Sequence, residues 1–134
     1  MFEGSSAADS FDVKKKWALK LQGYMTSPVI LDGMGIELNR DQRLVAVDLA
    51  DGTKLWEIKD KFGKYWSLAT DGTKVLALDQ KGELLLFQPT RGDWNLIDRV
   101  KVSKEETWAH LALVDGMIYI RTLKGLTAWA WQKP

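Results

Sequence analysis

The sequence contains no cysteine and only one histidine, His110. Without cysteine, the chain can form neither a disulfide nor a thiolate ligand or nucleophile. With one histidine, it cannot build a metal site from two histidines of the same chain. The P-loop, the G-x-G-x-x-G motif and the G-x-S-x-G motif are also missing, and no spacing of serine, histidine and aspartate marks a catalytic triad. The sequence therefore predicts no catalytic, cofactor-binding or metal-binding residue, and we expect a protein that is not an enzyme.

An excess of charge and a long apolar run are missing as well. Nineteen lysine and arginine residues stand against eighteen aspartate and glutamate residues, so the charge balance does not favour nucleic acid as a partner. No apolar run approaches the roughly 20 residues of a membrane-spanning helix, so we expect no membrane insertion. Residues 1–12 have neither the cationic start nor the apolar centre of a signal peptide and are expected to form a flexible polar lead. No compartment follows from these features.

Tryptophan is the abundant residue, with seven copies in 134 residues. Four of them are separated by 39, 38 and 37 residues: Trp17, Trp56, Trp94 and Trp131. A near-constant interval of about 40 residues is typical of propeller blades and of helical solenoids. The chain is therefore expected to be a repeat protein.

Short apolar runs separated by turn signals fill the repeat. Asp-Gly pairs, which favour tight hairpin turns, occur at 32–33, 51–52, 71–72 and 115–116. They indicate units of short antiparallel strands at 27–59, 64–102 and 107–131, of which the third has only three strands. The apolar spacing of 13–21 fits a helix or a strand, but Trp17 precedes Trp56 by one repeat. We therefore predict a strand at 13–21 that completes the third unit, in the same chain or in a second one.

The central strands of each unit are apolar on both faces, as at 44–47 and 75–78. An antiparallel sheet with one wet face would alternate apolar and polar residues, so these sheets must be packed between neighbours. Stacked four-stranded sheets form a β-propeller; a single β-sandwich is the alternative, but it would not require the tryptophan repeat. We predict an all-β fold of three four-stranded antiparallel blades, a partial β-propeller over residues 13–134.

Residues 46–56, AVDLADGTKLW, carry a resemblance to a known family. Blades of the quinoprotein type have the pattern Ala-x-Asp-x-x-Thr-Gly-Lys-x-x-Trp, and Ala46, Asp48, Gly52 and Trp56 occupy the matching positions. Asp51 replaces the threonine, and Thr53 replaces the lysine. The chain resembles the pyrroloquinoline-quinone-like (PQQ-like) propeller repeat over roughly residues 13–131. It looks like the C-terminal blades of large bacterial propeller proteins, which are often exported.

The resemblance implies structural roles for these residues. In the family, the tryptophan docks between adjacent blades, and the glycine allows a tight turn. The implied docking residues are Ala46, Asp48, Gly52, Trp56 and, in the second copy, Gly92 and Trp94. From its position before the turn, Asp48 is also expected to bind the backbone of that turn through its carboxylate.

Three functions follow from these patterns. The first is a non-catalytic module that binds proteins or assembles as a scaffold. The second is a fragment of a PQQ-dependent oxidoreductase, in which the resemblance implies a calcium-bound quinone stacked on Trp66 or Trp108, with Arg121 as a charged contact. The third is a lectin-like surface around Trp66 or Trp108. Possible surface contacts are Trp66, Trp108, His110 and Arg121, although His110 is better explained as a hydrogen-bonded structural residue.

Three blades cannot close a ring. Two copies would supply six blades, a common closed size. In such a homodimer, residues 13–21 of each chain would complete the third blade of the other and cover its bare edge. The remainder of a larger propeller is the alternative partner.

Overall fold

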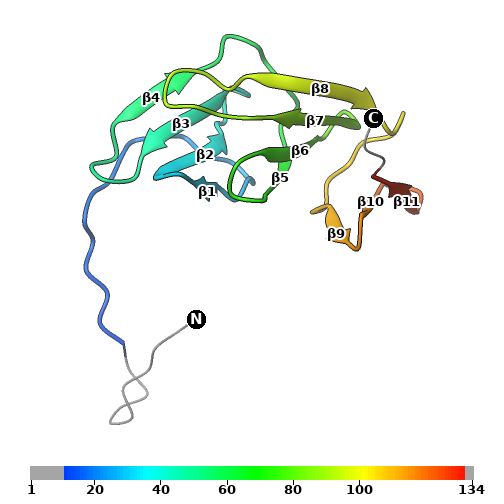
Figure 1. Cartoon of the computed structure of the whole chain (residues 1–134), viewed down its shortest axis with the longest axis horizontal. Helices are drawn as coiled ribbons and strands as arrows, with labels where there is room; N and C mark the ends of the chain where they lie inside the picture. Colours follow the sequence, from blue (N-terminus) through cyan, green and yellow to red (C-terminus); the bar gives the residue numbers. More distant parts are fainter. Residues whose placement is uncertain (1–10, 132–134) are drawn as a thin grey trace.

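The computed structural model describes residues 11–131, in which eleven β-strands form three antiparallel sheets and no helix occurs. The sheets follow one another along the chain (Figure 1). None of the described residues therefore forms a helix of the length and apolarity needed to cross a bilayer. The all-β architecture agrees with the sequence prediction.

The first and second sheets are four-stranded meanders, and the third has three strands. The strands of the first sheet are β1 (Val29–Leu31), β2 (Met34–Leu38), β3 (Leu44–Asp48) and β4 (Lys54–Glu57). Those of the second sheet are β5 (Trp66–Thr70), β6 (Val75–Asp79), β7 (Glu83–Phe87) and β8 (Leu96–Lys101). Those of the third sheet are β9 (Ala112–Val114), β10 (Met117–Arg121) and β11 (Leu126–Ala130).

Two of the Asp-Gly pairs form two-residue hairpin turns. Asp32 and Gly33 have φ values of 46° and 69°, and Asp115 and Gly116 have 47° and 76°. Two successive residues in the left-handed region match the twist of the flanking strands, and aspartate and glycine tolerate that region best. The hairpins β1–β2 and β9–β10 therefore form where the sequence predicts them.

Two clusters of buried side chains hold the sheets together. The larger cluster has twelve residues and lies between the first and second sheets. The smaller has five residues and lies between the second and third sheets. The smaller cluster consists of Leu76, Leu78, Leu84, Ile118 and Ile120. The second sheet is therefore covered on both faces, which explains why its central strands do not alternate with polar residues.

The strand predicted at 13–21 is wrong for the chain on its own. Residues 11–22 form no strand, and only an isolated bridge joins Gly23 to Asn39. A strand needs a neighbouring edge to accept its hydrogen bonds, and the edge of the third sheet does not lie beside this segment. Within the units predicted at 64–102 and 107–131, β8 begins at Leu96 and β9 at Ala112.

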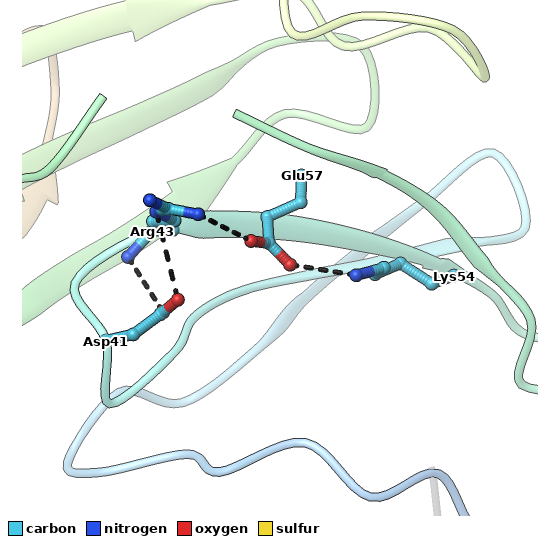
Figure 2. Close-up of polar contacts among 4 residues, drawn as sticks. All are labelled: Asp41, Arg43, Lys54 and Glu57. Atoms are coloured by element: carbon cyan, nitrogen blue, oxygen red, sulfur yellow. Dashed lines mark hydrogen bonds and ion pairs between the residues drawn. The ribbon is translucent and has the colours of Figure 1, made fainter. Parts of the chain in front are cut away.

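Charged side chains join β3 to β4 on the first sheet (Figure 2). Arg43 binds Glu57 at 3.3 Å, and Lys54 binds the other oxygen of Glu57 at 2.9 Å. Asp41 lies 3.9 Å from Arg43 on its other side. The hydrogen bond from Lys54, followed by that from Arg43, holds the pKa of Glu57 below its usual value. These partly exposed pairs fix a hairpin and contribute little to stability.

Candidate functional site

Part of the 46–56 motif faces the second sheet, and part faces the outer side of the first sheet. Ala46 is fully buried in the larger cluster. The Asp48 carboxylate accepts a hydrogen bond from the backbone N–H of Ala50 at 2.9 Å and forms an ion pair with Arg91. The hydrogen bond from Ala50, followed by that from Arg91, lowers the pKa of Asp48. The predicted carboxylate-to-turn bond is therefore confirmed, and the ion pair joins the first sheet to the β7–β8 turn.

Trp56 reaches the same β7–β8 turn. Its indole Nε1 donates a hydrogen bond to the backbone oxygen of Thr90 at 2.8 Å. Trp17 makes the corresponding contact one repeat earlier, where its Nε1 donates to the backbone oxygen of Leu49 at 2.9 Å. Both acceptors lie in the turn between the third and fourth strands of a sheet. Trp17 therefore has the relation to the first sheet that Trp56 has to the second.

Gly52 is needed at the point where Trp17 lies against the turn. Its φ is +77°, and an added Cβ would lie 2.6 Å from Cε3 of the Trp17 ring. No side chain fits in that space unless the ring moves. The glycine therefore serves both the turn and the approach of the indole.

Replacing Gly52 by alanine is expected to displace Trp17. Loss of the hydrogen bond from Trp17 to Leu49 should lower the free energy of unfolding by about 1 kcal/mol, in addition to the effect of backbone strain. Gly72→Ala is the matched control, since Gly72 has φ +94° but nothing within 4 Å of an added Cβ. Urea unfolding measures the difference in unfolding free energy between the two variants. Hydrogen exchange of the Trp17 indole N–H reports whether the ring is displaced. Equal losses with unchanged exchange would contradict the expectation.

Trp94 packs against the buried cluster between the first and second sheets. Its ring packs at 5.6 Å from Phe87 and 5.9 Å from Phe62, on the side of the first sheet. The pairing of β7 with β8 shifts by one residue at Leu86/Phe87, and Trp94 stands before β8 rather than in it. Gly92 lies in the same turn, with nothing within 4 Å of an added Cβ. Among residues 11–131, no hydrogen bond from the Trp94 indole to a turn is recorded, unlike those of Trp17 and Trp56, so its docking role stays a prediction.

Trp66 is not a surface residue, so its predicted role as a surface contact or cofactor platform is wrong. It is fully buried, and its ring lies 4.4 Å from that of Phe62. Its Nε1 donates to the carboxylate of Asp79 at 2.7 Å. Trp66 is the first residue of β5 and lies in the cluster between the first and second sheets. Both faces of its ring are therefore covered.

Asp79, the last residue of β6, has a buried carboxylate and is not among the predicted site residues. It is 1% exposed and accepts hydrogen bonds from Trp66 and from the backbone of Gly63 at 2.7 Å and Lys81 at 2.5 Å. The Thr107 hydroxyl donates to the Asp79 backbone oxygen. These donors satisfy the charge internally, so Asp79 is a structural centre of the second sheet. In the sequence, Asp79 directly follows four apolar residues, and this position could have indicated that its carboxylate is buried.

The remaining predicted contacts are dispersed. Trp108 is 37% exposed, stacks on Tyr65 at 6.1 Å and donates from Nε1 to Glu106. His110 Nδ1 lies 3.2 Å from the Ser67 hydroxyl, which agrees with a structural histidine. Arg121 is exposed at the end of β10. No contact recorded for the described residues joins these three side chains.

The residues named for a quinone cofactor do not fit that role. A stacked cofactor needs an open aromatic face, and Trp66 has none. Trp108 already stacks on Tyr65. Among residues 11–131, no three aspartate, glutamate or histidine side chains come close enough to hold a metal ion. No reaction step through the cofactor follows from this arrangement.

The two ends of the sheet stack are the candidate binding site. At one end, a hollow of about 330 Å³ lies between the outer face of the first sheet and the segment 17–23; its lining includes Trp17, Leu19, Ile30, Glu37 and Leu49. At the other end, all five residues of β11 are exposed. Leu126 is 70% exposed and Val114 54%. Exposed apolar side chains thus lie beside a strand edge that has no partner within residues 11–131.

Stacked antiparallel sheets, joined by turns that receive tryptophans, define the chain as a β-propeller module. The solved structure of BamB from Moraxella catarrhalis superposes with a TM-score of 0.56 and 26% identity over 77% of this chain and 30% of that one. The quinohemoprotein alcohol dehydrogenase ADHIIG from Pseudomonas putida HK5 superposes with a TM-score of 0.62 and 17% identity over 87% of this chain and 20% of that one. The designed protein Ika8 gives a TM-score of 0.58 and 14% identity over 77% of this chain and 32% of that one.

These similarities confirm the resemblance to a PQQ-like propeller repeat. No protein-family model matches the sequence, and no curated protein matches it. The chain spans about a third or less of the length of the structures that it resembles. The matches to ADHIIG and Ika8, at 17% and 14% identity, concern the fold alone.

Proposed function

We propose that this chain is a non-catalytic β-propeller module that binds a second copy of itself through the two ends of its sheet stack. The observation that carries the proposal is the position of Trp17. Its indole binds the turn of the first sheet as Trp56 binds the turn of the second. In this proposal, Trp17 and Trp56 are docking residues, and the segment around Trp17 occupies the place of a fourth strand whose sheet is not in the same chain.

The third sheet has only three strands among the described residues and could accept a fourth. In the first and second sheets, the third strand pairs with a fourth on its outer side. In the third sheet, β11 has β10 on one side, and on its other side no strand of the described residues pairs with it. Residues 13–21 of a second copy would pair with that edge, and the exchange repeated in both directions would give six blades. Pairing would satisfy the backbone groups of β11 and cover its apolar face.

The proposal predicts that the intact chain has a mass of twice 15.2 kDa by light scattering. A variant that lacks residues 1–22 is expected to have the mass of a single chain, because both exchanged strands are removed. A variant that lacks only residues 1–10 is the control and should keep the mass of the intact chain. Trp17→Ala, which leaves the backbone intact, should weaken the association by at least about tenfold, because the half-buried indole holds the exchanged segment in place.

A monodisperse single chain for the intact protein would contradict the proposal and would favour the remainder of a longer propeller as the natural neighbour. A dimer that survives removal of residues 1–22 would also contradict it. Circular dichroism of each variant distinguishes loss of association from loss of the fold.

A further inference from the structure

The contacts between successive sheets repeat one pattern at the end of the second strand. In the first interface, Leu38 of β2 lies in the same buried cluster as Ala77 of β6. In the second interface, Leu78 of β6 lies in the same buried cluster as Ile120 of β10. Each time, the last apolar residue of a sheet's second strand shares a buried cluster with a residue of the second strand of the next sheet, one register position earlier. If the third sheet of one copy packed on the first sheet of another, the equivalent residues of those two sheets would come together.

Strand register identifies those two residues. Leu38 pairs with Leu44, the first residue of β3, and Leu78 pairs with Leu84, the second residue of β7; each belongs to the cluster shared with the following sheet. In the third sheet, Arg121 pairs with Leu126, the first residue of β11. Arg121 is therefore the counterpart of Leu38 and Leu78. One place before Leu38 stands Glu37, which is the counterpart of Ala77 and Ile120.

Both residues lie on the faces that end the stack. Ile118 and Ile120 face the second sheet, so the alternation along β10 directs Arg121 and Tyr119 away from it. Ile36 and Leu38 face the second sheet from the other side, and Glu37 lines the hollow on the outer face of the first sheet. The third sheet thus presents a cation where the first sheet presents an anion.

The acidic residue lacks a charge partner among residues 11–131. Glu37 is half-buried, and burial raises the pKa of its carboxyl. Neither Glu37 nor Arg121 forms an ion pair among the described residues. A partly desolvated carboxylate on an otherwise apolar sheet face is costly unless a cation reaches it.

We propose that the third sheet of one copy packs on the outer face of the first sheet of a second copy and that Arg121 forms an ion pair with Glu37 of that copy. Leu126 and Tyr119 then fill the hollow beside Glu37. The inference rests on the proposed self-association and adds its register and charge specificity. The outer face of the first sheet carries Glu37, and that of the third sheet carries Arg121. Contacts between two first sheets or between two third sheets would therefore bring like charges together and are disfavoured.

Charge reversal tests the contact. Glu37→Arg places two arginines at each interface, and Arg121→Glu places two glutamates there, so each variant alone is expected to raise the dimer dissociation constant at least about tenfold. An equimolar mixture of the two variants is expected to recover the dimer. One of its interfaces then has the native pair, and the other has the same pair reversed.

Asp60→Arg and Lys59→Glu are the matched controls, since both residues are exposed in the loop after β4 and carry the same charge changes. They should leave the mass unchanged, and mixing them should have no effect. A dimer that tolerates Glu37→Arg or Arg121→Glu, or a mixture that stays monomeric while each chain is folded, would overturn the inference and leave the proposed self-association standing. A monomeric unaltered chain would overturn both.

Discussion

Gly82→Ala is expected to lower the free energy of unfolding by more than about 3 kcal/mol, through strain and overpacking together. Gly82 has φ +80°, where an L-residue with a side chain is strained by roughly 1–2 kcal/mol. An added Cβ would also collide with the backbone oxygen of Ser103 and lie 2.9 Å from its carbonyl carbon. The contact is with backbone, so no side-chain rotation can relieve it.

The position explains why the approach is so close. The backbone oxygen of Gly82 accepts hydrogen bonds from Val102 at 2.9 Å and from Ser103 at 3.1 Å. The glycine thereby holds the end of β8 against the β6–β7 turn. Moving Ser103 to admit a methyl group would break these bonds as well.

Gly116→Ala is the control for strain alone. Gly116 has φ +76°, but an added Cβ would meet nothing within 4 Å. Gly116→Ala should therefore lower the free energy of unfolding by only about 1–2 kcal/mol. Urea unfolding of both variants measures the difference, and equal losses would show that the backbone near Ser103 yields without cost.

Trp66→Ala is expected to cost about 3–5 kcal/mol, the usual result of removing a large buried aromatic side chain. Trp66 is fully buried between the first and second sheets and packs on Phe62. Its removal also takes one donor from the buried carboxylate of Asp79, and an under-satisfied buried charge adds to the loss.

Two further variants make this expectation specific. Trp66→Phe keeps most of the packing but removes the Nε1 donor, so its loss should fall between those of the native chain and Trp66→Ala. Trp129→Ala, at a residue that is 39% exposed, should cost less than about 1 kcal/mol. Calorimetric or urea unfolding measures all three, and a similar loss for Trp66→Ala and Trp129→Ala would refute the core role of Trp66.

Sequence reasoning predicted the parts of the fold that depend on neighbours in the chain. Asp32-Gly33 and Asp115-Gly116 form tight hairpins because aspartate and glycine tolerate left-handed backbone locally. Asp48 binds the turn two residues later for an equally local reason. The stacking of sheets was predicted because strands that are apolar on both faces leave few other arrangements.

The residues that were assigned wrongly depend on distant partners. Trp66 reads as a possible surface aromatic because a strand that is apolar on both sides does not reveal how deeply its first residue lies. Residues 13–21 have the composition of a strand, but pairing needs an edge that lies beside them. The ion pair between Asp48 and Arg91, 43 residues apart, has no local signature.

The unequal cores give the three sheets unequal local stability. Twelve buried side chains join the first two sheets, whereas five join the third to the second. In nearest-neighbour terms, the first two sheets form one cooperative unit, and the third opens at a lower free energy. A partner that binds the closed third sheet but not the open one would stabilise it by mass action. Folding of the last sheet would then depend on the concentration of the chain, so that assembly and the completion of folding become a single equilibrium.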